Sequence, residues 1–235
     1  MVTDAASAAR RLGRVALDLL FPPRCVGCGR GGVFLCDMCV AALPPAAPPR
    51  CPRCWQPGTG ECLDCWRAPP AFDGLRSAFV YEGTARELVH AFKFRAMTAL
   101  AGPMASLMAE AVRRHELRVD LVAPVPLSGL KQRLRGYNQA EALARVLARK
   151  LDLPLQSRAL VRRRHAPPQT RSADVEARRR NVADAFVCRE QGIAGRRVLL
   201  VDDVTTTGAT LDACASALKA AGARSVWALT FARED

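Results

Sequence analysis

Apolar runs and amphipathic stretches alternate along the last two thirds of the chain. Nearly continuous apolar runs predict strands buried in a sheet at 75–81, 121–126, 198–203 and 225–231. Apolar residues at helical spacing predict helices over 84–94, 100–115 and 141–150, with another helix opening after residue 208. Thr84 is the expected cap of the first of these helices. Strands and helices in alternation predict an α/β fold, a parallel sheet with helices on both faces.

The first third of the chain lacks this pattern and carries four Cys-x-x-Cys pairs instead. The eight cysteines are Cys25, Cys28, Cys36, Cys39, Cys51, Cys54, Cys62 and Cys65. Seven residues separate the two pairs of each half and eleven separate the halves, so the array is an internal duplication. Two such pairs complete a tetrahedral four-thiolate site. We therefore predict a double zinc ribbon over 21–68 with two structural zinc ions, each bound by one half; interleaved pairing is the alternative.

Proline-rich stretches mark the joints of this small module. The stretch 43–49 predicts a stiff spacer between the halves, and residues 68–70 predict the boundary with a main domain over 72–235. Trp55 and Trp66 each follow a cysteine pair. We expect them to cover the metal sites, with base stacking as the alternative.

Residues 1–20 predict one amphipathic helix. Its apolar face comprises Leu12, Val15, Ala16, Leu19 and Leu20. We expect this helix to dock on the protein, with a peripheral contact at the inner face of the membrane as the alternative. The stretch lacks the cleavage site of a signal peptide, and no apolar run of the chain approaches the length of a membrane span. The expected location is therefore the cytoplasm, where thiols stay reduced and favour metal over disulfides.

The strand 198–203 leads into the clearest chemical motif of the chain. It ends in the acid pair Asp202 and Asp203, and a hydroxyl-rich loop then opens onto a helix. The loop comprises Val204, Thr205, Thr206, Thr207, Gly208, Ala209 and Thr210. Free N–H groups and the dipole of a helix N-terminus favour phosphate, and Gly208 allows close backbone approach. Since neighbouring carboxylates suit ribose hydroxyls, or a divalent metal on pyrophosphate, the motif predicts a ribose 5-phosphate site.

Charge points to a polyanionic partner. Formal net charge is +13, and residues 113–189 contain 18 Lys and Arg against 7 Asp and Glu. Such a balance favours nucleic acid or a phosphorylated ligand. Lys93, near the end of the helix 84–94, and Arg135, in an expected cationic loop over 131–139, are candidate phosphate ligands. Candidate nucleic-acid contacts are Lys131, Arg133, Arg162, Arg163, Arg164, Arg178, Arg179 and Arg180.

Taken together, these motifs resemble known families. The stretch 198–210 resembles the phosphoribosyl pyrophosphate signature of type I phosphoribosyltransferases. The order of the motifs, from the cysteine array onward, resembles the ComF family. The motifs that carry this resemblance are Phe92-Lys93-Phe94-Arg95, Pro124-Val125-Pro126-Leu127, Arg135-Gly136-Tyr137-Asn138-Gln139, Pro168-Gln169-Thr170 and Arg180-Asn181.

The resemblance implies a fold and a ligand. A type I phosphoribosyltransferase-like domain would bind phosphoribosyl pyrophosphate with Mg²⁺, with Asp202 and Asp203 as catalytic residues on the ribose hydroxyls and the loop on the 5-phosphate. It further implies an accessory role in natural competence, supporting uptake of single-stranded DNA beside a helicase-like partner. An active phosphoribosyltransferase of nucleotide salvage or modification, with an unknown acceptor, is the alternative function.

Overall fold

The structure is a computed structural model that describes residues 22–127, 129–162 and 185–235. Its centre is a four-stranded parallel sheet in the order β1-β6-β5-β2. The strands are β1 (Gly74–Val80), β2 (Leu121–Pro124), β5 (Arg197–Thr205) and β6 (Ser225–Arg233). Residues 198–201 of β5 are fully buried, as their apolar run predicts. The four predicted strands and their parallel arrangement are confirmed, whereas the predicted N-terminal helix over 1–20 lies outside the described residues.

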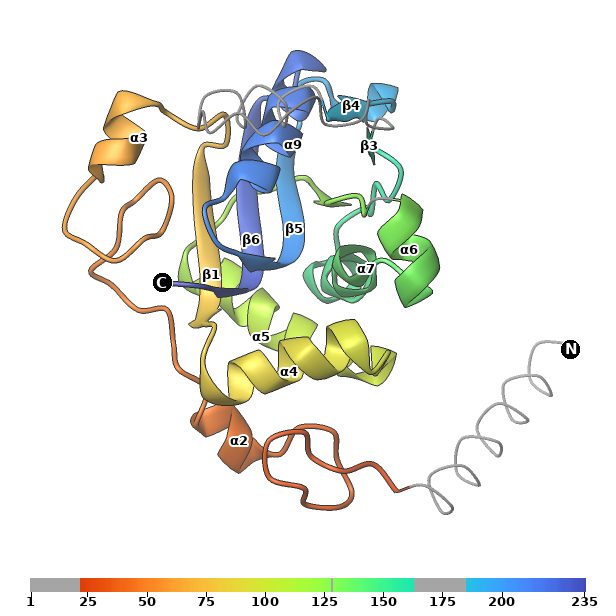
Figure 1. Cartoon of the computed structure of the whole chain (residues 1–235). Helices are drawn as coiled ribbons and strands as arrows, with labels where there is room; N and C mark the ends of the chain where they lie inside the picture. The colour runs from red at the N-terminus through yellow and green to blue at the C-terminus, as the bar shows by residue number, and fades with distance from the viewer. Residues whose placement is uncertain (1–21, 128, 163–184) are drawn as a thin grey trace, which may run out of the picture.

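Helices cover both faces of the sheet (Figure 1). One face packs against α4 (Gly83–Phe94), α5 (Ala101–Arg114) and α7 (Gln139–Leu151), and the 3₁₀ turn η1 (Thr98–Leu100) leads into α5. The other face packs against α9 (Ala209–Ala220) and a small antiparallel pair, β3 (Leu160–Arg162) and β4 (Phe186–Cys188). Side chains along β5 point alternately to the two faces of the sheet. Leu199 and Val201 therefore pack in the first core, and Val198 and Leu200 pack in the second.

Three local features differ from the sequence predictions. Thr84 is not the cap of α4, because the extended residue Glu82 precedes the helix and Gly83, at φ +45°, makes the turn into it. The expected cationic loop over 131–139 is helical as far as Arg135, in α6 (Gly129–Arg135), since Leu, Lys, Gln and Arg are strong helix formers. The strands β3 and β4 were not predicted, because three residues are too few to show periodicity.

The proline-rich stretch between the cysteine halves pairs with the sheet instead of spanning open solvent. Val80 N donates to Pro44 O at 2.9 Å, and Ala46 N donates to Ala78 O at 3.1 Å. Since β1 lies at one end of the strand order, this stretch covers part of an otherwise exposed sheet edge.

Each cysteine half contacts a different part of the main domain. The half that contains α2 (Asp37–Ala41) lies beside α4, and the half that contains α3 (Leu63–Arg67) lies beside β1 (Figure 1). Trp55 is buried and donates through Nε1 to Ala46 O, whereas Trp66 is 72% exposed on α3. The 3₁₀ turn η2 (Gln191–Ile193) precedes β5. None of the described helices is long and apolar enough to span a bilayer.

Candidate functional site

Each half of the cysteine array closes on itself. In both clusters the four Sγ atoms lie within 4.8 Å of one another. The Sγ atoms of Cys25 and Cys36 are 3.7 Å apart, and those of Cys54 and Cys62 are 3.5 Å apart. Four thiolates around zinc at the usual bond length lie about 3.8 Å from one another, so both clusters fit a tetrahedral zinc ion. The sequential pairing is confirmed, and the two halves form two four-cysteine zinc sites.

The same backbone contact recurs in both halves, as a duplicated unit requires. Cys36 N donates to Cys25 Sγ, and Cys62 N donates to Cys51 Sγ, each at 3.4 Å. Burial by itself raises the pKa of Cys25, but N–H donors from Cys36 and its neighbours outweigh it and lower that pKa to about 6. The corresponding balance lowers the pKa of Cys51 to about 7. One thiolate of each site is thus favoured near neutral pH, the form that binds metal.

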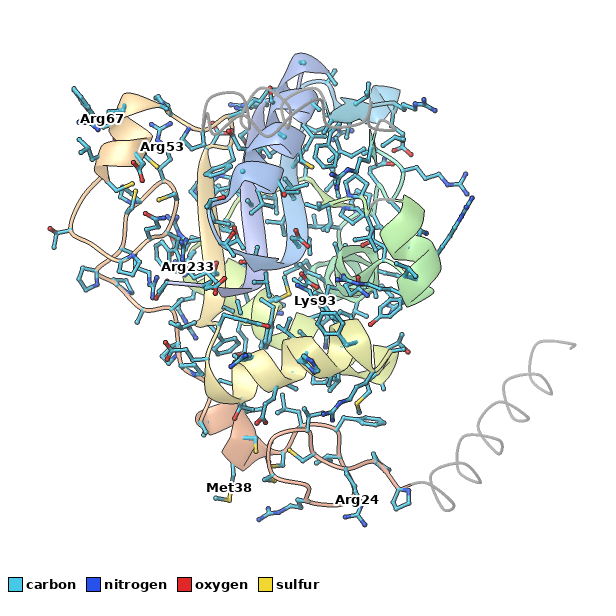
Figure 2. All side chains as sticks on the ribbon, in the orientation of Figure 1. Arg24, Met38, Arg53, Arg67, Lys93 and Arg233 are labelled. Carbon is cyan, nitrogen blue, oxygen red and sulfur yellow. The ribbon has the colours of Figure 1, made fainter. Side chains whose placement is uncertain are left out.

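The acid pair lies at the carboxyl end of β5 in a cavity of 190 Å³. Lys93, from α4, reaches into this cavity and its Nζ lies 2.9 Å from Asp203 Oδ1 (Figure 2). Arg135, from α6, lines the same cavity. The tertiary structure therefore brings together four predicted site residues, separated by up to 110 positions in the sequence.

The two carboxylates differ in their surroundings, because Lys93 forms its ion pair with Asp203. Burial and the adjacent charge of Asp203 raise the pKa of Asp202 to about 8, although Lys93 opposes this shift. Asp203 N also donates to Asp202 Oδ1 at 2.8 Å. Free of ligand, the pocket therefore favours a proton on Asp202 at neutral pH. A ligand that brings hydroxyl donors or a cation would stabilise the ionised carboxylate of Asp202 in place of that proton.

The hydroxyl-rich loop follows the acid pair and opens α9, as predicted. Gly208 takes φ +80° and directly precedes the helix, and Asp212 N donates to Gly208 O. Val204 and Thr210 line the cavity, whereas Thr206, Thr207 and Ala209 are exposed to solvent beside it. Thr205 is buried, because β5 runs two residues further than predicted and takes this side chain into the core. The loop thus presents backbone and threonine hydroxyls at a helix N-terminus, the arrangement that binds phosphate.

Sequence reasoning did not single out Asn138 and Gln139 as site residues. Asn138 caps α7 through its Oδ1 and donates from Nδ2 to Val125 O at 3.1 Å. Gln139, 2% exposed, accepts from Arg135 NH1 at 3.2 Å and lines the cavity. Its buried Nε2 has no hydrogen-bond partner within the described part of the chain, a costly state that a ligand oxygen would relieve. In the sequence, these residues showed only as an Asn directly before an apolar helix, a pattern typical of an ordinary N-cap.

A second cavity, of 520 Å³, adjoins the first. The two share Pro126, Leu127, Asn138 and Arg162 as lining residues. The larger one adds charged side chains of both signs, Glu141, Arg158, Arg189 and Glu190.

The candidate nucleic-acid residues divide into three groups. Arg162 is half-buried between the two cavities, with its guanidinium 5.5 Å from the Phe186 ring. Arg133 is exposed on α6, the helix whose sequence also includes Lys131, and Arg133 does not line the acid-pair cavity. Arg163, Arg164, Arg178, Arg179 and Arg180 lie outside the described residues.

Comparison with known proteins identifies both parts of the chain. The phosphoribosyl transferase domain family matches residues 138–234, and the double zinc ribbon domain family matches residues 16–66. Competence protein F of Haemophilus influenzae is 34% identical over 177 residues, which cover 72% of this chain and 77% of that protein. DNA utilization protein YhgH of Escherichia coli O157:H7 is 32% identical over 175 residues, covering 72% of this chain and 76% of that protein.

Among solved structures, a glutamine phosphoribosylpyrophosphate amidotransferase from B. subtilis covers 56% of this chain and 26% of its own. It aligns with a TM-score of 0.41 and 19% identity. The domain matches, together with the parallel sheet and the two four-cysteine sites, confirm a phosphoribosyltransferase-type fold with an N-terminal double zinc ribbon.

The separate closure of the two cysteine halves predicts the metal content of two variants. Cys28→Ser and Cys62→Ser each remove one ligand from one cluster. We expect each variant to retain one tightly bound zinc where the unaltered protein retains two, and the double variant to retain none. Elemental analysis after dialysis against a weak chelator measures this. Loss of both ions from either single variant would contradict independent sites.

The raised pKa of Asp202 predicts how stability depends on pH. The folded state keeps the proton to about pH 8 while the unfolded chain releases it near pH 4, so this group lowers stability as pH rises between those values. Asp202→Asn keeps the Asp203 N–H bond and removes the titration. We expect the variant to be more stable than wild type by about 1–3 kcal/mol at pH 8.5.

Urea denaturation of both proteins across pH 5.5–8.5 tests this. The difference between their free energies of unfolding reports on Asp202, because the two proteins share all their other ionisable groups. The extra stability of the variant over wild type should shrink steadily toward pH 5.5. A gap that is constant, or that widens at low pH, would show that Asp202 is ionised throughout the range.

Proposed function

The chain belongs to the competence protein F (ComF) family, and on this basis we propose that it is a cytoplasmic accessory protein of DNA uptake whose acid-pair cavity binds phosphoribosyl pyrophosphate with Mg²⁺. The names of its relatives, a competence protein and a DNA utilization protein, support the DNA-linked role. One observation carries the ligand assignment. The cavity combines two carboxylates, three cationic side chains and a buried amide whose Nε2 has no hydrogen-bond partner among the described residues, beside a helix N-terminus.

Each group of the proposed ligand has a matching group in the cavity. The ribose hydroxyls would donate to Asp202 and Asp203, which relieves the repulsion between the two acids. The 5-phosphate would accept N–H and hydroxyl donors from residues 206–210. Lys93 and Arg135 would face the pyrophosphate, and Mg²⁺ would neutralise the remaining charge on its oxygens. Gln139 Nε2 would donate to a ligand oxygen and so gain the partner that it lacks.

Single-stranded DNA is the proposed macromolecular partner, and a helicase-like protein of the uptake system is the proposed protein partner. The excess of 11 positive charges over residues 113–189 supports a phosphate-rich ligand. Arg133 offers an exposed cation on α6, and Arg162 reaches the rim shared by the two cavities. Strand binding near the phosphoribosyl site would allow one ligand to influence the other.

An active phosphoribosyltransferase is the second candidate, and the adjoining 520 Å³ cavity favours it. Transfer requires a nucleophile beside the anomeric carbon of the ribose. The bond from that carbon to pyrophosphate breaks as the bond to the acceptor forms, and pyrophosphate leaves with the electron pair. The lining of the larger cavity, with arginines and glutamates, suits an acceptor that is polar and carries both donors and acceptors.

Removal of the acid pair tests the ligand assignment. We expect wild type to bind phosphoribosyl pyrophosphate with Mg²⁺ in calorimetry, and Asp202→Asn/Asp203→Asn to bind at least ten-fold more weakly, because two charged hydrogen-bond acceptors are lost. Gln139→Met, which removes the buried donor at similar volume, should weaken binding about five-fold. Glu110→Gln/Asp152→Asn is the matched control, since it neutralises two exposed acids that do not line the cavity.

Equal affinity of the acid-pair variant and wild type would overturn the assignment, as would the absence of binding to wild type. Release of pyrophosphate on addition of nucleobases or other acceptors separates the two candidate functions. Turnover that depends on Asp202 and Asp203 would favour the transferase; binding without turnover favours the accessory role.

Salt dependence tests the DNA partner. We expect a single-stranded oligonucleotide to bind with an affinity that falls steeply with salt, and Arg163→Gln/Arg164→Gln to reduce the logarithmic slope by about 0.7 for each phosphate that the variant no longer neutralises. Arg113→Gln/Arg114→Gln changes the same charge at exposed positions on α5 and should leave the slope closer to wild type. Equal effects of the two double variants would mean that only overall charge matters and that the arginine cluster does not bind the strand directly.

A further inference from the structure

Arg233 is a buried cation that none of the sequence motifs includes. It is the last residue of β6 and only 1% of it is exposed. Its guanidinium donates from NH1 to Cys54 O at 2.7 Å and from NH2 to Thr206 O at 3.2 Å. Its Nε lies 2.9 Å from Asp235 Oδ1. One planar group thus bonds two backbone segments that are 152 positions apart in the sequence.

The two segments are a zinc ligand and the phosphate loop. Cys54 belongs to the second four-cysteine cluster, and Thr206 lies in the loop between β5 and α9. Figure 2 shows Arg233 at the carboxyl ends of β1 and β6, toward the second cysteine half. The fixed fork of the guanidinium, in which the donor directions are set by the planar group, holds both carbonyls in one relative position.

The bond to Thr206 O also determines where the loop aims its donors. Across a trans peptide the C=O and the next N–H point in opposite directions. A fixed carbonyl of Thr206, directed at Arg233, therefore aims the N–H of Thr207 away from Arg233, to the opposite side of the peptide unit. Thr207 is one of the exposed loop residues beside the cavity, so its N–H is available to an anion.

A second arginine shows what this contact adds. Arg50 also binds Asp235, at 2.8 and 2.6 Å, and donates to the Trp55 carbonyl, so it holds the same cysteine half to the C-terminus. Its hydrogen bonds do not include the phosphate loop. Of these two arginines, Arg233 alone joins the metal site to the loop.

We propose that Arg233 is a positioning residue that couples the second zinc site to the phosphate loop. Metal bound by Cys54 keeps the Cys54 carbonyl in place, Arg233 transmits that position to the Thr206 carbonyl, and the Thr206–Thr207 peptide is held ready for an anion. Loss of zinc from the second site, or of the guanidinium, loosens the loop without altering any of its residues. The inference rests on the proposed function only in that the anion is the 5-phosphate.

Backbone hydrogen exchange of the loop, measured without any ligand, tests the coupling directly. In Arg233→Met we expect the two hydrogen-bonded amides that close the loop, Ala209 N on Thr207 Oγ1 and Asp212 N on Gly208 O, to exchange at least ten-fold faster than in wild type, while two zinc ions are retained. Arg50→Met, the matched control, should leave loop exchange at the wild-type rate even if it lowers the melting temperature. Arg233→Lys keeps the charge but replaces the rigid guanidinium fork by a single nitrogen on a flexible stem, so its exchange should be intermediate.

Two cysteine variants test whether metal binding at the second site takes part in the coupling. Cys62→Ser, which disables the second cluster, should accelerate loop exchange as Arg233→Met does, and the double variant should add little more. Cys28→Ser disables the first cluster, whereas Arg233 bonds to a ligand of the second, so this variant should leave the loop unchanged. Affinity for phosphoribosyl pyrophosphate should follow the same order, with a five- to twenty-fold loss for Arg233→Met.

The outcomes separate this inference from the proposed function. Loop exchange at the wild-type rate in Arg233→Met, or equal acceleration in Cys28→Ser and Cys62→Ser, would overturn the coupling. Failure of wild type to bind phosphoribosyl pyrophosphate would overturn the ligand assignment, yet exchange would still decide the coupling. If Arg233→Met does not fold, loop exchange in Arg233→Lys, Cys28→Ser and Cys62→Ser is compared with wild type in the same way.

Discussion

Burial of the central strand β5 between two helical layers is the constraint on which the rest of this structure depends. The strand is covered on both faces, so the two acids at its carboxyl end, Asp202 and Asp203, lie where water stabilises charge poorly. The protein meets this cost with Lys93 from α4, a backbone donor and a raised pKa on Asp202. The free pocket is therefore incompletely satisfied, which is the electrostatic basis of the affinity that we propose for a ligand rich in hydroxyls and metal-bound oxygens.

The positive charge of the chain serves two spatially distinct purposes in this architecture. Lys93 and Arg135 are held close to the acid pair, where each contributes to a defined cavity. Arg133 on α6 is exposed to solvent, where charge acts over longer range and is screened by salt. A polyanion attracted to the outer surface would approach the same rim that Arg162 shares between the two cavities.

The zinc ribbons are integrated into the main domain rather than attached to it by a tether. The stretch between them hydrogen-bonds to the edge strand β1, and Leu75 N donates to Arg53 O within the second half. Buried contacts at Arg50 and Arg233 extend this interface to the C-terminus. Metal sites that lack a core of their own thus gain support from the sheet, and the sheet gains a rigid neighbour beside its phosphate loop.

The sequence by itself determined the zinc ribbons, the four strands of the main sheet with the helices that follow them along the chain, and the acid pair with its hydroxyl-rich loop. These features depend on local spacing: Cys-x-x-Cys pairs, apolar periodicity, and two acids before a hydroxyl-rich turn. Only the tertiary structure decided that Lys93 meets Asp203, that Gln139 is buried without a partner for its Nε2 among the described residues, and that Arg233 links Cys54 to Thr206. Such contacts join residues far apart in the chain, and their geometry follows from strand order and helix packing, which no local pattern encodes.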